Sequence, residues 1–460
     1  MMNSADEIQR EIDQLESSKS RIDSTIAELH SKLSRLKKLE QPNDAAFPPV
    51  IPSSLPPDLI HRYSRHLILP SFGVQGQKKL LNSSILVIGA GGLGSPVLLY
   101  LAASGVGACI QSPQSFSSFN SSKPLIGRLG IVDHDAVELS NMHRQIIHTE
   151  SFIGKPKVSS AAAACRAINS NLKITEHLQL LSTSNALQII AQYDVVVDAS
   201  DNAPTRYTIN DACVILKKPL VSGAALGLEG QLTVYNFNNG PCYRCLFPTP
   251  PPAAACQRCA DGGVLGVVPG IIGCLQALEA IKIASGSGET MSQRMLIFDA
   301  STTRIRVVKI RGKSTDCEVC GEKSRFDEGV FGEFDYLKFA QIGGNKVEVL
   351  NKEERISGEE FCRKVAAGEE YLLLDVRPKH QFEIVSLPRS LNVPFGCLET
   401  RLPEVEAAAS GRSLYVICRR GNDSQLAVKT LRKFGFLDAK DVIGGLESWS
   451  RDVDPTFPIY

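Results

Sequence analysis

The N-terminal segment of the chain carries apolar side chains at alternating steps of four and three. These positions are Ile8, Ile12, Leu15, Ile22, Ile26, Leu29, Leu33 and Leu36, with Lys19 as the one interruption. Such a heptad pattern, in a segment rich in Glu, Lys and Ser, predicts that residues 5–40 form a coiled-coil or docking helix. A lone amphipathic helix that folds back on the body of the protein is the alternative. The proline-rich residues 41–57 predict a stiff linker.

From residue 58 to about 312, short apolar runs alternate with helical patterns. SILVIGAGGLG, RLGIVDHD and YDVVVDASDN indicate strands, and the segments that follow them indicate helices. This alternation predicts an α/β fold built on a doubly wound, Rossmann-like parallel sheet. After the charged residues 313–345 we expect a smaller α/β unit, which contains YLLLDVRP, SLNVPF, LYVICRRGNDS and KDVIGG.

Residues 108–127 interrupt the alternation, because they are rich in serine and show no periodicity. A glycine-rich turn and the acidic residue at the end of the next strand usually lie about 20 residues apart. Gly94 and Asp133 are almost twice as far apart as this, and removing residues 108–127 restores the usual spacing. The spacing predicts a surface insertion between the first helix and the second strand, whose role the sequence does not indicate.

Composition narrows the class of protein. The 460 residues, 43% of them hydrophobic, predict about two to four domains. Fifty Lys and Arg against 49 Asp and Glu leave a net charge of +1, which argues against a general basic surface for nucleic acid or an acidic membrane. No uninterrupted apolar run approaches the ~18 residues that span a bilayer. The N-terminus resembles neither a secretory signal nor a transit peptide, so we expect a soluble protein of the cytosol.

A glycine-rich turn follows the first predicted strand directly. Gly89, Gly91 and Gly94 fit G-x-G-x-x-G, in which glycines let the backbone approach a phosphate at a helix N-terminus. Asp133, at the end of the next strand, is placed to accept hydrogen bonds from a ribose. Taken alone, these residues suggest an NAD-dependent oxidoreductase.

The residues that follow favour a nucleoside triphosphate instead. Ser140, Asn141, Arg144 and Lys157 add hydrogen-bond donors and two positive charges. Extra cations suit a triphosphate whose negative charge grows as pyrophosphate leaves. Asp201 is a candidate to hold a magnesium ion on those phosphates.

Six motifs in this order resemble the ThiF/MoeB family of ubiquitin-activating-type adenylating enzymes over residues 58–322. They are RYSRHLILP, GAGGLGSP, VDHDAVELSNMHRQ, DASDNAPTRY, PCYRC and CEVC. The resemblance implies ATP-dependent adenylation of the C-terminal glycine of a ubiquitin-like sulfur carrier. It also implies a homodimer, because Arg65 matches an arginine that reaches into the partner subunit's site. The residues that it implies contact ATP are Gly92, Asp133, Asn141, Arg144, Lys157, Asp201 and Asn202.

Two C-x-x-C pairs, Cys242/Cys245 and Cys317/Cys320, lie far apart in the sequence. Four thiolates around zinc form a closed tetrahedral site with no open position for water. We therefore expect a structural zinc ion that ties two distant segments together, and the family resemblance implies the same site.

Cys418 begins CRRGNDS, between the apolar run LYVI and a predicted helix. A loop at a helix N-terminus is expected to lower the pKa of the thiol, with Arg419 and Arg420 favouring anions nearby. Residues 346–460 resemble a rhodanese domain through LLLDVRPKHQFEIVSLPRSLNVPF, CRRGNDS and GGLESW, and in that family the loop cysteine carries a persulfide. Asp423 departs from the more basic loops of thiosulfate-using rhodaneses, which leaves the sulfur donor open.

Cys256 and Cys259 lie in ACQRCADGGVLG, after a proline-rich segment. A second zinc pair is one interpretation. The combination of the two domains implies instead that Cys259 accepts the acyl group, and it implies no role for Cys256.

The implied partners are the small subunit of molybdopterin synthase, the ubiquitin-related modifier of tRNA wobble-uridine 2-thiolation, and a persulfide-donating cysteine desulfurase. Activation of a modifier for protein conjugation, an oxidoreductase fused to a rhodanese, and a non-catalytic scaffold are the alternatives.

Overall fold

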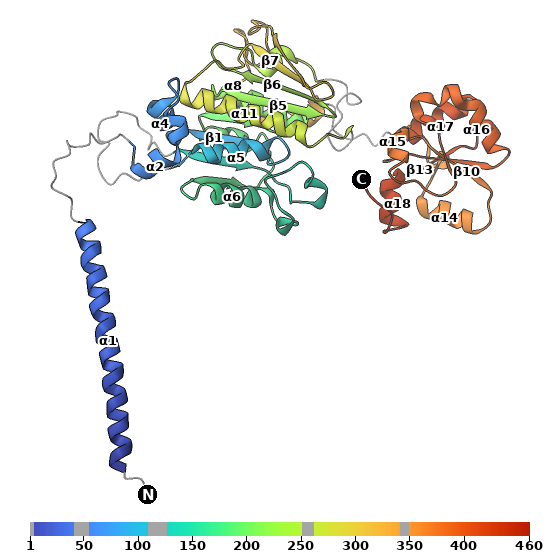
Figure 1. Ribbon diagram of the computed structural model, residues 1–460. Helices are drawn as coiled ribbons and strands as arrows, with labels where there is room; N and C mark the ends of the chain where they lie inside the picture. Colours follow the sequence, from blue (N-terminus) through green and yellow to red (C-terminus); the bar gives the residue numbers. More distant parts are fainter. Residues whose placement is uncertain (1–3, 41–54, 109–126, 251–261, 341–348) are drawn as a thin grey trace. The chain divides into compact units, whose positions relative to one another are not determined.

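The computed structural model describes residues 4–40, 55–108, 127–250, 262–340 and 349–460. The chain divides into two compact units, residues 1–74 and 75–460. The first unit contains α1 (Ser4–Glu40), α2 (Pro57–Arg62) and α3 (Ser64–Leu67), and α4 (Gly73–Asn82) begins at its end. The second unit contains two sheets, each with its own helices (Figure 1).

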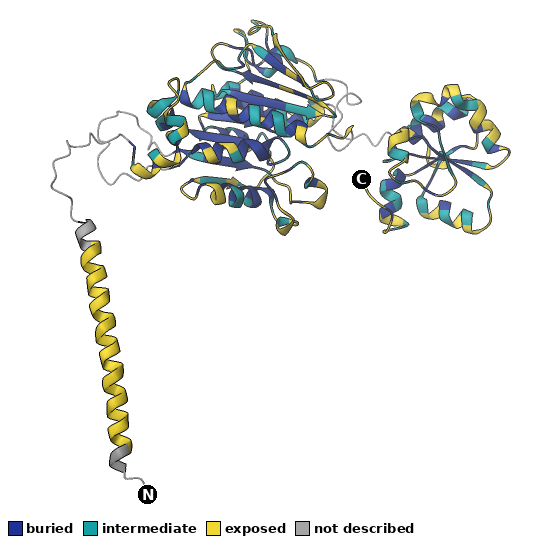
Figure 2. Ribbon diagram, in the orientation of Figure 1, coloured by how far each residue is buried: buried dark blue, intermediate teal, exposed yellow. Residues whose placement is uncertain are grey.

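Helix α1 confirms the helix predicted for residues 5–40. Side chains 7–36 are exposed throughout, as Figure 2 shows along the helix. The eight apolar heptad residues are included, with exposed fractions between 42% and 65%. The pairing of this helix in a coiled coil stays a prediction.

The larger sheet has eight strands in the order β3-β2-β1-β4-β5-β6-β7-β8, of which the first five are parallel. The doubly wound fold predicted from the alternation is therefore confirmed. The antiparallel β6, β7 and β8 were not predicted. The strands are β1 (Ser84–Ile88), β2 (Arg128–Val132), β3 (Ile174–His177), β4 (Val195–Asp198), β5 (Leu220–Leu226), β6 (Glu229–Tyr235), β7 (Arg294–Asp299) and β8 (Arg304–Lys309).

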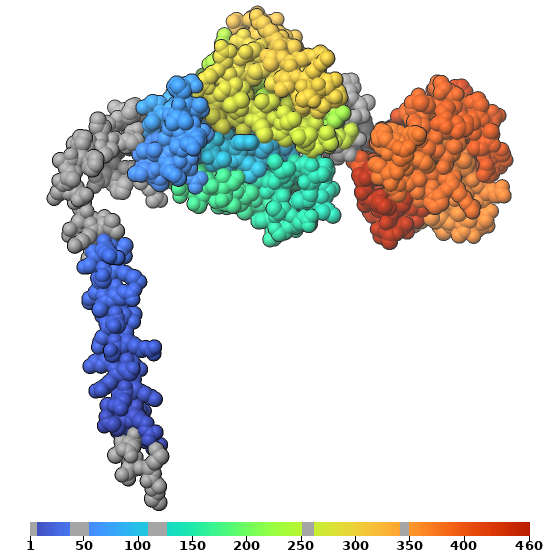
Figure 3. All heavy atoms as spheres, in the orientation of Figure 1, coloured from blue at the N-terminus to red at the C-terminus, as the bar shows by residue number. Residues whose placement is uncertain are grey.

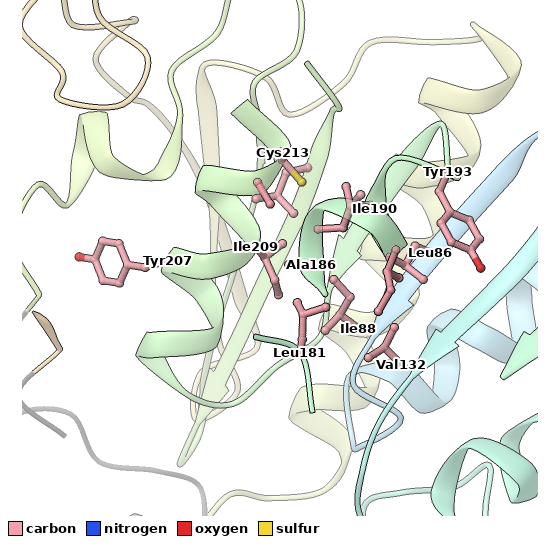
Figure 4. Packing of buried hydrophobic residues seen from close by; sticks show 14 of the residues in the cluster. Leu86, Ile88, Val132, Leu181, Ala186, Ile190, Tyr193, Tyr207, Ile209 and Cys213 are labelled. Carbon is pink, nitrogen blue, oxygen red and sulfur yellow. The ribbon is translucent and has the colours of Figure 1, made fainter. Parts of the chain in front are cut away.

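Helices cover both faces of the parallel part of this sheet. On one face lie α5 (Gly94–Ser104), α6 (Lys157–Ile168) and α11 (Val267–Ser285), and on the other lie α7 (Ala186–Ile190) and α8 (Ala203–Ile215). Figure 4 shows Leu86 and Ile88 of β1 and Val132 of β2 near Ala186 and Ile190 of α7. The central strands β1 and β4 are buried at every position, which explains their apolar runs ILVI and VVV.

Helix α11 is the one described helix long and apolar enough to cross a membrane. It packs against β4, β5, β6 and α5, and it carries Glu279, which is 2% exposed. The Glu279 carboxylate accepts a hydrogen bond from the Met291 N–H at 2.7 Å and forms an ion pair with Lys282. These contacts make α11 a core helix of the domain built on the eight-stranded sheet, which is the larger domain of the chain.

Two short helices from the charged stretch between the domains also pack on the larger domain. They are α12 (Glu328–Glu333) and α13 (Tyr336–Phe339), with Asp327 and Asp335 as their N-caps. Both contact α8, and Phe331 and Tyr336 join its buried cluster. The packed unit therefore continues beyond residue 322, where the sequence places the end of the domain.

Residues 109–126, the core of the predicted insertion, lie outside the described residues, but both of their flanks are described. A Cβ added at Gly107 would lie 2.7 Å from the Cα of Arg128, so the two backbones are in contact. Gly107 also has a φ of +72°, which favours glycine. The chain thus leaves and re-enters the larger domain at one point.

The smaller domain has a five-stranded parallel sheet in the order β11-β10-β12-β13-β9. Its strands are β9 (Arg355–Ile356), β10 (Tyr371–Asp375), β11 (Ser390–Asn392), β12 (Ser413–Ile417) and β13 (Lys440–Val442). Separate buried clusters fill its two faces, and Figure 3 shows the outer surface of this domain, in orange and red. Its helices are α14 (Gly358–Ala366), α15 (Lys379–Phe382), α16 (Leu402–Ala409), α17 (Asp423–Lys433) and α18 (Gly445–Asp452).

Candidate active sites and metal centre

The glycine turn lies at the carboxyl end of β1, which has β2 on one side and β4 on the other. In an open α/β sheet, ligands bind at this reversal of strand order. Two of its glycines are required by packing: a Cβ at Gly89 would lie 2.6 Å from the Ala199 carbonyl oxygen, and one at Gly94 would lie 1.9 Å from that of Gly89. Gly91 differs, because its nearest neighbour would be Gln145 Nε2 at 3.8 Å. No packing contact of this kind therefore explains a glycine at position 91.

This difference predicts that Gly91→Ala keeps the fold and weakens ATP binding. We expect an unchanged melting temperature and a KM for ATP raised about tenfold or more, since the backbone can no longer approach the phosphates closely. ATP–pyrophosphate exchange and thermal unfolding measure the two effects. Gly94→Ala is the matched control, which should unfold the turn. An unchanged KM in Gly91→Ala would remove Gly91 from the nucleotide site.

Asp133 is held against the turn by backbone hydrogen bonds. Its Oδ2 accepts from the Ala90 N–H at 2.8 Å, and its Oδ1 accepts from the Asp135 N–H at 2.9 Å. The carboxylate is partly exposed and so has lone pairs left for a ribose. Asp133, which the sequence predicts to bind the ribose, therefore lies next to the glycine turn.

The segment after β2 brings Arg144 to the same turn and also contains Asn141. It contains the 3₁₀ helices η1 (Leu139–Asn141) and η2 (Glu150–Phe152). Asn141 is buried. The Arg144 Nη1–H donates to the Ser140 carbonyl oxygen at 2.8 Å. The Arg144 Cγ would lie 3.6 Å from a Cβ at Gly92. One of the two predicted cations therefore lies beside the turn.

Lys157, the second predicted cation, begins α6 with its side chain 8% exposed. Its Nζ donates to Asp135 Oδ2 at 2.7 Å, and its backbone N–H donates to the Asp135 carbonyl oxygen at 2.9 Å. Asp135 thus holds the ammonium group close to the carboxyl end of β2. The sequence did not single out this carboxylate.

A buried ion pair supports the loop after β4. Asp198 is fully buried and accepts from the Ser200 and Ser222 hydroxyl groups, and its Oδ2 lies 3.1 Å from Arg206 Nε. Arg206 also donates to the carbonyl oxygens of Ser200 and Gly223. Despite burial, which lowers it, the pKa of Arg206 is raised by the Asp198 charge. Through these contacts the Asp198–Arg206 pair connects β4, β5 and α8 next to the loop that follows β4.

Asp201 and Asn202 lie on that loop. Asn202 caps α8 by accepting from the Thr205 N–H at 3.0 Å, and its amide donates to Asp201 Oδ1 at 3.4 Å. The Asp201 side chain is exposed, as a metal ligand for a bound nucleotide would be. Arg65 lies on α3 in the first unit, and its reach into a partner subunit stays a prediction. Cys256 and Cys259 lie outside the described residues.

The four cysteines of the two C-x-x-C pairs meet in one cluster. Helix α9 (Tyr243–Leu246) begins directly after Cys242 and contains Cys245. Their sulfur atoms are 3.8 Å apart for Cys242–Cys245, 3.6 Å for Cys242–Cys317 and 3.3 Å for Cys245–Cys320. A tetrahedral zinc ion with Zn–S bonds of about 2.3 Å requires sulfur separations of about 3.8 Å. The residues therefore fit a Cys₄ zinc site.

Cys317→Ser should release the zinc ion and lower the melting temperature of the larger domain by about 10 °C or more, because metal binding contributes folding free energy. Metal analysis of the purified full chain and thermal unfolding measure these changes. Cys274→Ser, on α11 and outside the cluster, is the matched control and should keep the metal. A wild-type chain purified without zinc would contradict the assignment.

Cys418 follows β12 and precedes α17, as predicted. The thiol is 2% exposed, and its Sγ accepts from the Gly421 N–H at 3.1 Å and lies 3.2 Å from the Ser424 hydroxyl oxygen. The loop packs on Gly444 and Gly445, since a Cβ at Gly445 would lie 2.3 Å from the Cys418 carbonyl oxygen. The loop thus surrounds the sulfur with backbone donors.

The expectation of a lowered thiol pKa is wrong for this structure. Burial raises the pKa of Cys418 and the Asp423 charge raises it further, while hydrogen bonds from Ser424 and Gly421 lower it in part. The two arginines do not compensate, because Glu447 Oε1 lies 2.8 Å from Arg420 Nε and 3.6 Å from Arg419 Nε. Desolvation of the sulfur therefore outweighs the donors of the loop.

Comparison with known proteins assigns a family to each of the two predicted domains. Residues 63–319 match the ThiF family, and residues 359–452 match the rhodanese-like domain. The chain is 55% identical to adenylyltransferase and sulfurtransferase MOCS3 of Arabidopsis thaliana, with 100% of each chain covered. It is 59% identical to adenylyltransferase and sulfurtransferase MOCS3-1 of Zea mays over 88% of this chain and 85% of that protein. The chain belongs to the MOCS3 family of adenylyltransferases and sulfurtransferases.

The crystal structure of E. coli MccB with MccA-N7isoASN is a more distant match. It is 21% identical, with a TM-score of 0.47, and the match covers 57% of this chain and 75% of that chain. This likeness is too distant to locate site residues in the MOCS3-family chain. The predicted combination of a ThiF domain with a C-terminal rhodanese domain is confirmed by the family matches, while the individual site residues stay predictions.

Two residues at the turn of this MOCS3-family chain were not among those predicted. His148 Nε2 lies 2.9 Å from the Ala90 carbonyl oxygen, and its Nδ1 lies 2.9 Å from the Ser160 hydroxyl. Burial lowers the pKa of His148, so the ring is neutral and Nε2 donates to the carbonyl. Gln145 is 3% exposed, and its Oε1 has no hydrogen-bond partner among the described residues. In the sequence, the signal that could have indicated Gln145 was its place at the end of the motif VELSNMHRQ.

A buried arginine links the cluster of four cysteines to α8. Arg244, between Cys242 and Cys245 in sequence, is 2% exposed, and its Nη2 donates to Asp211 Oδ2 at 2.7 Å. The same oxygen accepts from the Tyr336 hydroxyl at 2.7 Å. Aromatic rings of Tyr207, Phe326, Phe334 and Phe339 lie around the guanidinium, the nearest at 4.4 Å. This contact joins the metal segment, α8 and α13.

Tyr460 supports the sulfur loop of the MOCS3-family chain. Arg377, 1% exposed and paired with Asp375, donates to the Tyr460 hydroxyl at 2.5 Å. Arg419 donates to the Tyr460 backbone oxygen, and its guanidinium lies 5.0 Å from the Tyr460 ring. The residue after Cys418 is therefore anchored through Tyr460. Because Arg419 and Tyr460 are far apart in the sequence, no local pattern indicated this contact.

Proposed function

We propose that the chain adenylates the C-terminal glycine of a ubiquitin-like sulfur carrier with ATP and then replaces the activated oxygen with sulfur. The observation that carries the proposal is the pairing of two sites in one chain. The larger domain has a glycine turn with Arg144 beside it and with Lys157 held by Asp135 after β2, and the smaller domain has a loop built around Cys418. Activation is necessary because a free carboxylate is a poor electrophile.

In the first step, the carrier carboxylate attacks the α-phosphorus of ATP and pyrophosphate leaves. The N–H groups at Gly91 and Gly92 face the phosphates, and Asp133 accepts from the ribose. Arg144 and Lys157, with Asn141, stabilise the charge that develops on the leaving pyrophosphate. A magnesium ion at Asp201, near Asn202, would supply further charge neutralisation.

In the second step, the persulfide anion on Cys418 attacks the carbonyl carbon and AMP leaves. The Gly421 and Ser424 N–H groups, which already face Sγ, stabilise the persulfide anion. A thiol then attacks Cys418 Sγ in the resulting acyl disulfide. The S–S bond breaks, the thiol forms a new disulfide with Cys418, and the carrier leaves as the thiocarboxylate. Cys259 is either a transient acyl acceptor or this resolving thiol.

The partners follow from the family resemblance. The carriers are the small subunit of molybdopterin synthase and the ubiquitin-related modifier, so the chain serves molybdenum cofactor biosynthesis and tRNA wobble-uridine 2-thiolation. A cysteine desulfurase supplies the persulfide in the cytosol, and the enzyme is a homodimer in which Arg65 completes the partner's ATP site. No membrane or nucleic acid takes part directly.

The test is incubation of the full chain with ATP, Mg²⁺, a carrier ending in Gly-Gly and a persulfide donor, followed by intact mass of the carrier. The expected product has one sulfur in place of one oxygen and forms only with ATP. Carrier adducts on protein lysines would instead indicate conjugation. A carrier of unchanged mass and no release of pyrophosphate would overturn the proposal.

A further inference from the structure

Helix α1 has an apolar seam that nothing in the proposed reaction uses. At about 1.5 Å per residue, its 37 residues extend over about 55 Å. Ile12, Ile26 and Leu33 occupy heptad a positions, and d positions alternate with them from Ile8 to Leu36. The smallest exposed fraction among the eight apolar residues is 42%, at Ile12. An exposed apolar stripe of this length, interrupted at Lys19, normally marks an interaction surface.

The spacing of the stripe specifies the kind of partner. Steps of four and three give a period of about 3.5 residues, so the seam stays straight only if the helix supercoils around another helix. The stripe is also narrow, with about two apolar positions in seven, whereas a helix packed on a domain surface usually has three. A single partner helix therefore fits this surface better than a groove on a globular domain.

Charge along the helix indicates that the partner is a second copy running in the opposite direction. Counted in sequence, residues 4–23 contain six acidic and three basic residues, and residues 24–40 contain two acidic and four basic residues. We infer that α1 pairs with α1 of a second copy as an antiparallel two-stranded coiled coil. The acidic half of each helix then lies along the basic half of the other.

A parallel pair of the same helices is disfavoured at two places. Lys19 occupies an a position, so in a parallel pair it would face Lys19 of the other copy within the seam. Glu11 at a g position would face Glu16 at the following e position, twice per dimer. In the antiparallel pair, Lys19 faces an apolar d residue, along which its methylene groups can pack while its ammonium reaches water.

This contact is separate from the catalytic dimer. An antiparallel pair has its two-fold axis perpendicular to the helices, and a closed dimer of the larger domain also has a two-fold axis. One symmetric dimer can therefore contain both contacts. The inference does not depend on the proposed reaction, since neither the adenylation nor the sulfur step involves α1.

The test is distance measurement by pulsed electron paramagnetic resonance on the full chain. The spin label is carried by a genetically encoded non-natural residue, because the chain has 13 cysteines. Labels at Gln9 should lie about 35–45 Å apart in the antiparallel dimer, and labels at Asp23 within about 15 Å. Short distances at both positions would show a parallel pair and overturn the inference. No defined distance at either position would show that α1 does not pair with itself.

Two matched variants separate this contact from the rest of the protein. Ile26→Asp introduces a charge into the seam and should abolish the short distance at Asp23. Ala27→Asp adds the same charge on the outer face of the same helix and should leave that distance unchanged. Both variants should keep wild-type ATP–pyrophosphate exchange. An Asp23 distance that survives Ile26→Asp would contradict the assigned seam.

Discussion

A Cys418→Ser variant is expected to lose sulfur transfer while it still adenylates the carrier. The hydroxyl group of serine cannot carry a persulfide, and no other described cysteine lies in the β12–α17 loop. None of the groups proposed for ATP–pyrophosphate exchange lies in the smaller domain, so the rate of exchange should stay within about twofold of wild type. Intact mass of the carrier and the exchange assay, on the same preparation, measure the two activities.

Cys397→Ser is the matched control for this variant. Cys397 is an exposed cysteine of the same domain that lies outside the loop. Its replacement should leave thiocarboxylate formation unchanged. Full sulfur delivery by Cys418→Ser from a persulfide donor would remove the loop from the mechanism, and loss of exchange in the same variant would show that the two domains are not independent.

Arg244→Met is expected to give a large loss of stability in the larger domain. Removing one partner of a buried ion pair costs about 3–5 kcal/mol, because the other charge stays buried without compensation. Among the described residues, the Asp211 carboxylate would then keep the Tyr336 hydroxyl and the Asn210 amide as donors. A decrease in melting temperature of about 10 °C is the corresponding result.

The double variant Asp211→Asn with Arg244→Met separates charge burial from packing. It removes both charges, and the methionine side chain still fills the space between the aromatic rings. We expect it to recover at least about half of the lost stability, since replacing a whole buried ion pair is often neutral. A double variant less stable than Arg244→Met alone would show that the carboxylate itself is not the source of the loss.

Much of the fold was predictable because burial produces simple patterns. Strands β1 and β4 are covered on both faces, which explains the apolar runs ILVI and VVV within them. The metal cluster was predictable for a different reason: each C-x-x-C pair is a local signal, and four cysteines in two pairs fit one ion.

Other features depend on contacts that sequence spacing does not show. The antiparallel β6 follows from a very short connection after β5, which leaves no room for a crossover helix. The raised pKa of Cys418 depends on how deeply the loop is buried and on Glu447, which takes up the arginine charges. The local sequence indicated the hydrogen-bond donors around the Cys418 sulfur. It did not indicate that this sulfur is buried away from solvent.

The contact between Gly107 and Arg128 affects how well the chain tolerates insertions between these two residues. Because the two sides of this junction already touch, the number of residues between them affects only the entropy of closing a loop, which grows slowly with length. Insertions of different lengths at this junction should therefore leave the glycine turn of the same sheet unchanged. An engineered reporter or affinity module could be grafted at this junction without moving a strand.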